Sequence, residues 1–120
     1  MAIDKKFINI FQNVCTKAAL ASHYFVGKKD KIASDKAAVD AMRSELNKIE
    51  MKGQVVIGEG ELDEAPMLYI GEKLGTKNGP ELDIAVDPLE GTNFAANNLP
   101  GALSVIAVSA NSHLFTAPEP

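Results

Sequence analysis

The stretch that decides the fold is Asp83-Ile84-Ala85-Val86-Asp87-Pro88-Leu89-Glu90-Gly91-Thr92-Asn93-Phe94. Its apolar run, residues 84–86, predicts a short buried strand. We expect this strand to end at Asp87, because Pro88 has no N–H to donate to a ladder and restricts the residue before it to extended conformations. A tight turn follows at Gly91, next to the hydroxyl of Thr92. An acidic turn at the end of a buried strand is therefore the first feature to explain.

The chemistry of this turn suits a hard cation. The carboxylates of Asp87 and Glu90, together with the backbone carbonyl of Leu89, are oxygen ligands of the kind that Mg²⁺ or Mn²⁺ prefers. Gly91 would also let the main chain approach a bound phosphate. The alternative is an ordinary surface turn at the end of a strand. This stretch alone leaves both interpretations open.

Composition limits the possible partners. The chain has 120 residues, 46% of them apolar, and predicts one globular domain at most. Twelve basic and 16 acidic residues give a net charge of −4, which offers no electrostatic support for binding nucleic acid or an anionic membrane. Cys15 is the sole cysteine and no signal-like or membrane-spanning apolar segment is present. We therefore expect a cytoplasmic protein.

Two helices are predicted before the first strand. Apolar or small residues recur at steps of three and four over residues 7–25, and Gly27 ends this pattern. A second helix is expected from near Asp35 to residue 49. As a cap, Asp35 would accept hydrogen bonds from the N–H groups of the first turn. The same position could instead aim its carboxylate into a site.

A second acidic segment follows the predicted strand at residues 55–57. It reads Gly58-Glu59-Gly60-Glu61-Leu62-Asp63-Glu64. The two glycines invite comparison with a dinucleotide-binding loop, but Asp63 occupies the place of the third glycine. The four carboxylates would also repel a pyrophosphate, so we reject a nucleotide site. A flexible acidic surface loop and a cation site remain as alternatives.

The later elements complete an α/β fold. The expected order is helix, helix, strand, helix, strand, short helix and strand hairpin. The third helix is predicted over residues 66–75, the short helix from residue 92 to a break at 97–101, a buried strand over 102–110, and its hairpin partner over 113–115.

Three carboxylate sources thus occur in one small α/β unit: two strand ends and one helix start. Strand ends in such folds gather at one edge of the sheet, where sites form. Each contact between carboxylates costs on the order of 1–4 kcal/mol, depending on the local dielectric. Divalent cations would relieve this repulsion, and two of them could clamp a phosphate. The pattern therefore indicates metal-assisted hydrolysis of a phosphoester.

These residues resemble a known family. Residues 56–72 and 83–92 are similar to the signature blocks of class II fructose-1,6-bisphosphatase, the bacterial GlpX type, and residues 30–35 and 38–43 resemble its N-terminal block. The Asp-Pro-Leu-Glu-Gly-Thr turn alone indicates the wider superfamily of metal-dependent, lithium-sensitive sugar and inositol phosphatases. The Glu-Gly-Glu-x-Asp-Glu-Ala-Pro-Met block narrows the resemblance to this family, and the likeness covers nearly the whole chain.

The resemblance implies a role for each matching residue. The implied ligands of two or more Mg²⁺ or Mn²⁺ ions are Asp35, Glu59, Asp87, Glu90 and the Leu89 carbonyl. Asp63 and Thr92 match the residues that activate and orient the attacking water. Contacts to the substrate phosphate are expected from Gly91, Thr92 and, more weakly, Lys31. The implied reaction removes the 1-phosphate of fructose 1,6-bisphosphate, giving fructose 6-phosphate in gluconeogenesis.

The chain departs from the family in length and at one position. Family members are well over twice as long, and their later part supplies a further metal-binding glutamate and the basic residues that hold the sugar's second phosphate. Gly101 stands where the family usually has asparagine. We therefore expect residues 1–120 to be the N-terminal metal-binding part of a sugar-phosphatase domain, incomplete at the C-terminus and homo-oligomeric when complete.

Two alternatives remain open. The same chemistry could act on sedoheptulose 1,7-bisphosphate or an inositol phosphate. Otherwise the chain is a truncated, catalytically silent segment that binds a partner, and this alternative predicts exposed apolar surface around Val105.

Overall fold

The structure, a computed structural model, describes residues 5–24, 27–58, 68–90 and 103–110. Two helices precede a four-stranded mixed sheet, which confirms the predicted α/β class. The elements are α1 (Lys6–His23), α2 (Lys31–Leu46), β1 (Lys52–Ile57), β2 (Lys73–Leu74), β3 (Glu81–Glu90) and β4 (Leu103–Ala110).

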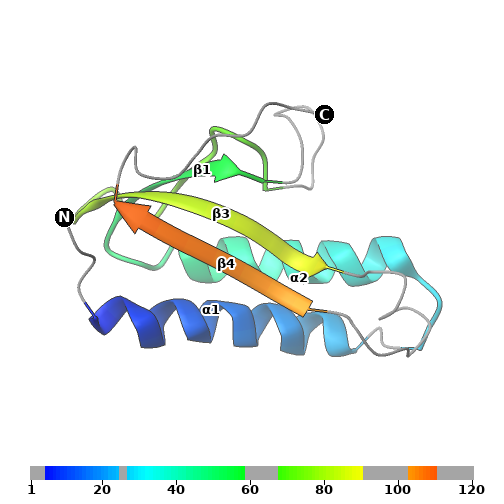
Figure 1. Cartoon of the computed structure of the whole chain (residues 1–120). Helices are drawn as coiled ribbons and strands as arrows, with labels where there is room; N and C mark the ends of the chain where they lie inside the picture. The colour runs from blue at the N-terminus through cyan, green and yellow to red at the C-terminus, as the bar shows by residue number, and fades with distance from the viewer. Residues whose placement is uncertain (1–4, 25–26, 59–67, 91–102, 111–120) are drawn as a thin grey trace.

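The sheet has the order β2-β1-β3-β4. β1 and β3 are parallel, whereas β2 and β4 join the outer sides of this pair in antiparallel orientation. Both helices lie on the same face of the sheet (Figure 1). Because β1 and β3 are parallel, the acidic segments that follow them in sequence leave the sheet at the same edge.

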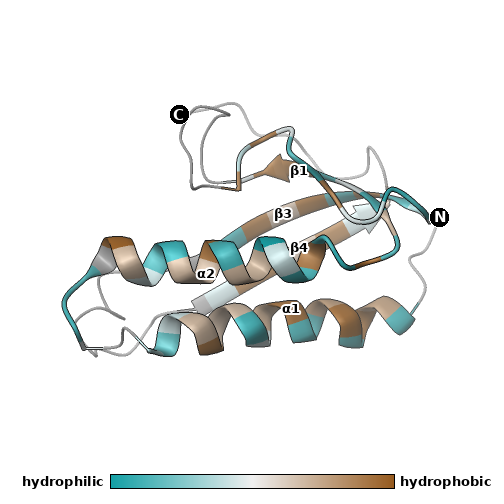
Figure 2. Cartoon of the chain, turned by 180° about the vertical axis from the view of Figure 1, so that it is seen from behind, coloured by the Kyte–Doolittle hydropathy of each residue, from teal (hydrophilic) through white to brown (hydrophobic). Residues whose placement is uncertain are grey.

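The core lies between the helices and the sheet. Both helices alternate hydrophobic and hydrophilic residues along their length, so each presents one apolar stripe inward (Figure 2). The predicted stripe of the first helix is confirmed for Phe7, Phe11, Val14 and Ala18, which are buried, but not for Ile10, which is 36% exposed. The largest fully buried apolar side chains of the described residues are Met42, Leu46, Met51, Leu68, Ile84, Val14, Val39 and Val55.

The start of the second helix differs from the prediction. α2 begins at Lys31, and Asp30 is its N-cap, with a side-chain oxygen that accepts a hydrogen bond from the Ala33 N–H at 3.0 Å. Asp35 is therefore in the second turn of the helix and is not its cap. Several residues before and after the true start are compatible with capping, so the sequence did not distinguish them. The Asp35 carboxylate therefore does not cap the helix.

The third predicted helix is wrong for its described part, residues 68–75. Leu74 belongs instead to strand β2 and pairs with Gly53. Gly71 has a φ of +95°, which a helix does not allow, and its N–H donates to the Val55 carbonyl at 2.8 Å. Leu74 of the predicted apolar stripe is buried and Ile70 is partly buried, whereas Leu68, which the helical spacing did not include, is fully buried. Backbone hydrogen bonds to β1 hold this segment as a turn followed by the two-residue strand β2. Pairing with β1 therefore decides the conformation of this segment, although its apolar spacing is helical.

Strand β3 does not end at Asp87 but continues to Glu90. Asp87 pairs with Val105 and Glu90 pairs with Leu103, so β3 uses one more residue than β4 over this interval. This is a β-bulge, the position in a sheet where a residue without an N–H is tolerated. Pro88 lies in the bulge and is buried. Asp87 and Glu90 therefore both lie within strand β3.

β4 confirms a strand within the range predicted, residues 102–110, but the prediction that it is buried is wrong: none of its described side chains is buried, and Val105 is 41% exposed. The short helix near Thr92 and the hairpin partner over 113–115 lie outside the described residues. Of the helices in the described part, none is both long and apolar enough to cross a membrane.

Candidate metal centre

The register of β1 and β3 sets the geometry of the candidate site. Ile57 at the end of β1 pairs with Ala85 of β3. In the sequence, Glu59 follows Ile57 by the same interval at which Asp87 follows Ala85. Glu59 lies outside the described residues, so the equal spacing is a property of the sequence and shows no contact between Glu59 and Asp87. The C-terminal ends of the two parallel strands lie at one edge of the sheet.

Asp35 and Asp87 belong to different elements, and the charge of Asp87 acts on the Asp35 carboxyl. Asp35 lies on α2 and is partly buried, and Asp87 lies next to the bulge of β3. The pKa of the Asp35 carboxyl is raised, first by burial and second by the negative charge of Asp87. Two of the four predicted carboxylate ligands, distant in sequence, thus interact in the folded chain.

This pair fits a divalent cation. Burial and a like charge both oppose ionisation of Asp35, so a cation between or beside the two carboxylates would stabilise their ionised forms. Both groups offer hard oxygen ligands suited to Mg²⁺ or Mn²⁺. Within the described ranges, no cluster of three or more histidine, cysteine, aspartate or glutamate side chains is present. The described part of the chain therefore supplies two carboxylates of a predicted larger ligand set.

The remaining predicted residues are described only in part or not at all. Leu89 and Glu90 are the last residues of β3, beside or within the bulge, and only their backbone is described. Lys31 is the first residue of α2, and its side chain is likewise not described. The other predicted residues lie outside the described ranges: Glu59, Asp63, Gly91 and Thr92.

One ion pair of the described residues was not assigned a role from the sequence. The Arg43 guanidinium on α2 donates two hydrogen bonds to the Glu72 carboxylate, at 2.8 Å from Nε and 3.1 Å from Nη2. The Glu72 side chain is only 10% exposed. The hydrogen bond to Glu72 is the first cause of a raised Arg43 pKa. Both residues stand in the blocks that resemble the phosphatase family, which is the signal that could have singled them out.

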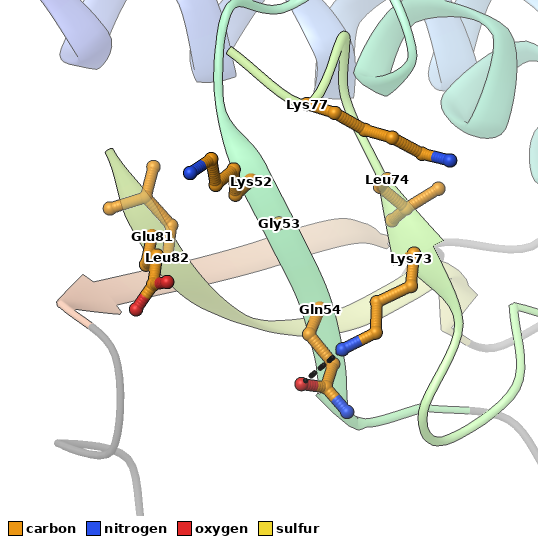
Figure 3. Close-up of a pocket in the computed structure, with 8 residues that line it drawn as sticks. All are labelled: Lys52, Gly53, Gln54, Lys73, Leu74, Lys77, Glu81 and Leu82. Atoms are coloured by element: carbon orange, nitrogen blue, oxygen red, sulfur yellow. Dashed lines mark hydrogen bonds between the residues drawn. The ribbon is translucent and has the colours of Figure 1, made fainter. Parts of the chain in front are cut away.

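A surface cavity of about 430 Å³ lies elsewhere, at the other end of β1 and β3. Three lysines contribute to its lining: Lys52, Lys73 and Lys77. Their ammonium groups do not converge, because Lys52 and Lys77 point away from one another and Lys73 donates to the Gln54 side chain at 3.0 Å (Figure 3). Since this cavity contains none of the predicted site residues, the carboxylate edge remains the candidate site.

The fold is similar to that of a solved structure. An extragenic suppressor from Pyrococcus furiosus superposes with a TM-score of 0.58, at 16% sequence identity, over 88% of this chain and 41% of its own. At that identity the similarity concerns the fold alone.

Sequence comparison is more specific. Residues 6–120 match the family described as bacterial fructose-1,6-bisphosphatase, glpX-encoded, and the chain belongs to this family. Two Prochlorococcus marinus proteins, from strains MIT 9303 and MIT 9515, are 51% and 52% identical over 117 residues. Both are named D-fructose 1,6-bisphosphatase class 2/sedoheptulose 1,7-bisphosphatase. The match covers 98% of this chain but only 35% of each relative.

Proposed function

We propose that this chain carries part of the metal centre of a sugar-bisphosphate phosphatase that removes the 1-phosphate of fructose 1,6-bisphosphate. The interaction of Asp35 with Asp87 supports this proposal most directly, because it joins two carboxylates predicted as ligands from separate sequence blocks. Membership of the family adds the class of substrate.

The ligand set that we propose consists of Asp35, Glu59, Asp87, Glu90 and the Leu89 carbonyl. When bound, Mg²⁺ or Mn²⁺ would supply positive charge against the substrate phosphate and favour ionisation of water. The parallel pairing of β1 with β3 supports placing Glu59 beside Asp87, and the bulge of β3 supports directing the turn after Glu90 toward the same edge.

The chain's own residues would handle the attacking water and the phosphate. Thr92 orients the water and Asp63 accepts its proton as the water oxygen bonds to phosphorus. The bond from phosphorus to the sugar oxygen then breaks, that oxygen takes up a proton from solvent, and Asp63 releases its proton to solvent, which yields fructose 6-phosphate and inorganic phosphate. Backbone N–H groups at Gly91 and Thr92 stabilise the charge that develops on the phosphate, with Lys31 as a further contact.

A second substrate is supported by the names of the relatives. The two Prochlorococcus proteins carry the sedoheptulose 1,7-bisphosphatase name as well. The two sugar bisphosphates share the reacting group, so the carboxylate edge serves either reaction. We further propose a cytoplasmic location and a homo-oligomeric complete enzyme, which would be checked by fractionation and by light scattering.

Phosphate release tests the proposed reaction. Fructose 1,6-bisphosphate is incubated with the purified protein and Mn²⁺, and with sedoheptulose 1,7-bisphosphate in parallel. We expect release that EDTA abolishes and that added Mn²⁺ restores. Release that persists in EDTA would contradict the metal-dependent reaction. Release from a longer protein that contains this chain, but not from residues 1–120 alone, would favour the catalytically silent segment.

A further inference from the structure

Strand β4 forms one edge of the described sheet, and its sequence contains nothing that opposes pairing with a further strand. An edge strand presents unpaired backbone N–H and C=O groups, which folded proteins protect with short edges, charged side chains or proline. β4 is eight residues long, and its sequence LSVIAVSA has no charged residue, proline or glycine. Among the described residues, no strand lies beyond it. The outer side of β4 therefore favours the addition of another strand.

The opposite edge of the sheet is protected. It is formed by β2, which has only two residues, one of them the exposed Lys73. A very short strand and a lysine both disfavour pairing between edges. Within the described sheet, each chain thus has one edge suited to pairing. Association through a single edge closes after two copies, whereas two such edges would build an open filament.

The core is incompletely covered beside β4. Ile106 and Val108 pack against the core but are only partly buried, whereas Val105 lies on the other face of the strand and is 41% exposed. Cys15 of α1 is also a partly buried neighbour of the core, and its interaction with Ser104 places it beside β4. The partly buried apolar side chains that border the core therefore gather between α1 and the outer side of β4.

A second copy of the chain fits this edge. Two β4 strands related by a two-fold axis run antiparallel, and residues directly opposite one another in an antiparallel pair share a face of the sheet. Ile106 of one copy then lies opposite Ile106 or Val108 of the other copy, on the face that carries the helices. Like charges do not meet along the strand, because β4 is uncharged. The pairing would extend the apolar core of each copy toward its two-fold axis.

We propose that β4 is a dimerisation edge: two copies of this chain pair antiparallel through β4 and join their sheets into one. A second copy is the partner because the strand's alternation and its lack of charge are self-complementary. The inference rests on the described strands and on α1, and it does not depend on the proposed phosphatase function.

The mass of the protein in solution tests the pairing. Light scattering after size exclusion, over a range of concentrations and without metal or substrate, should give twice the mass of one chain. Ala107→Lys brings the charges of two copies close together on the exposed face of the paired strands, so it should weaken dimerisation at least about tenfold. Leu20→Lys, at a 62% exposed position on α1, is the matched control and should remain dimeric.

Hydrogen exchange locates the interface. Amides of β4 that do not donate to β3 should exchange at least about tenfold more slowly at high than at low protein concentration, whereas amides of β2, on the opposite edge, should keep their rates. Val105→Lys is the second variant if Ala107→Lys does not fold. It should weaken dimerisation in the same way, because Val105 is also exposed on β4.

A single-chain mass at every concentration would overturn the proposal. In that case, slow exchange of the β4 amides would mean that another segment of the same chain, such as the strand predicted over residues 113–115, covers the edge. A dimer that persists in both lysine variants would place the interface elsewhere and would equally overturn the pairing, as would β4 exchange rates that do not change with concentration.

Discussion

At the scale of single residues, Asp35 holds a negative charge that its surroundings oppose. Its pKa is raised in the folded chain by burial and by the charge of Asp87. The stability that its protonated form contributes is therefore present below the unfolded pKa and is lost as the pH rises through the folded pKa. Above the folded pKa, the ionised carboxylate destabilises the metal-free fold.

Asp35→Asn should consequently raise the melting temperature of the EDTA-treated protein at neutral pH. The advantage should shrink as the pH falls below the folded pKa, because wild-type Asp35 is then protonated as well. Thermal unfolding followed by circular dichroism over a pH series measures this effect. Asp40→Asn, at an exposed position paired with Lys36 on the same helix, is the control and should give no increase. An equal or lower melting temperature for Asp35→Asn at neutral pH would contradict the raised pKa.

The interaction of Asp35 with Asp87 could be anticipated in part. The sequence led to this pair through the resemblance of its blocks to the family, although it placed Asp35 at a helix start and Asp87 at a strand end, and the structure has neither. The ion pair of Arg43 with Glu72 could not be anticipated in this way. Its partners are 29 residues apart, and nothing in the local pattern of either one distinguishes a partly buried partner from a solvated charge.

At the scale of elements, the start of α2 depends on Asp30. Its carboxylate accepts the Ala33 N–H, one of the donors that a helix N-terminus leaves unsatisfied. Asp30→Ala should lower the free energy of unfolding by about 0.5–2 kcal/mol, and Asp30→Ser should retain most of it. Urea unfolding of the three proteins measures the difference. Equal stability of Asp30→Ala and the wild type would mean that the cap contributes nothing to folding.

The elements were predictable where local pattern and tertiary pairing agree. α1, β1 and β4 follow their apolar spacing closely. The segment over residues 68–75 does not, because its backbone hydrogen bonds to β1 and the positive φ of Gly71 exclude a helix. Likewise, Pro88 was expected to end its strand, but a bulge lets the strand continue past it. Both differences arise from pairing with a distant strand, which spacing along one segment does not reveal.

At the scale of the whole molecule, the described helices cover one face of the sheet (Figure 1). Ile84 of β3 is fully buried toward them, whereas Val105 of β4 is 41% exposed. Ile84→Ala should therefore cost about 2–5 kcal/mol of unfolding free energy. Val105→Ala should cost less than about 1 kcal/mol. Chemical denaturation of both variants compares the two positions, and an equal loss at Val105 would show that a further surface covers β4 in solution.

The arrangement of the sheet explains how the ends of β1 and β3 come to one edge. The sequence predicted only that strand ends gather at one edge of the sheet, by the general rule for α/β folds. The parallel pairing of β1 with β3 is the arrangement by which the structure brings their ends to one edge. The exposed Val105 agrees with the apolar surface anticipated around β4.

We propose that the carboxylates of Asp35 on α2 and Asp87 on β3 bind one cation. Titration of the metal-free protein with Mn²⁺, followed by calorimetry, tests it in the wild type, Asp35→Asn, Asp87→Asn and the control Asp40→Asn. We predict that Asp35→Asn and Asp87→Asn each weaken binding by more than about tenfold, whereas Asp40→Asn binds as the wild type does. Wild-type isotherms for both Asp35→Asn and Asp87→Asn would contradict the account.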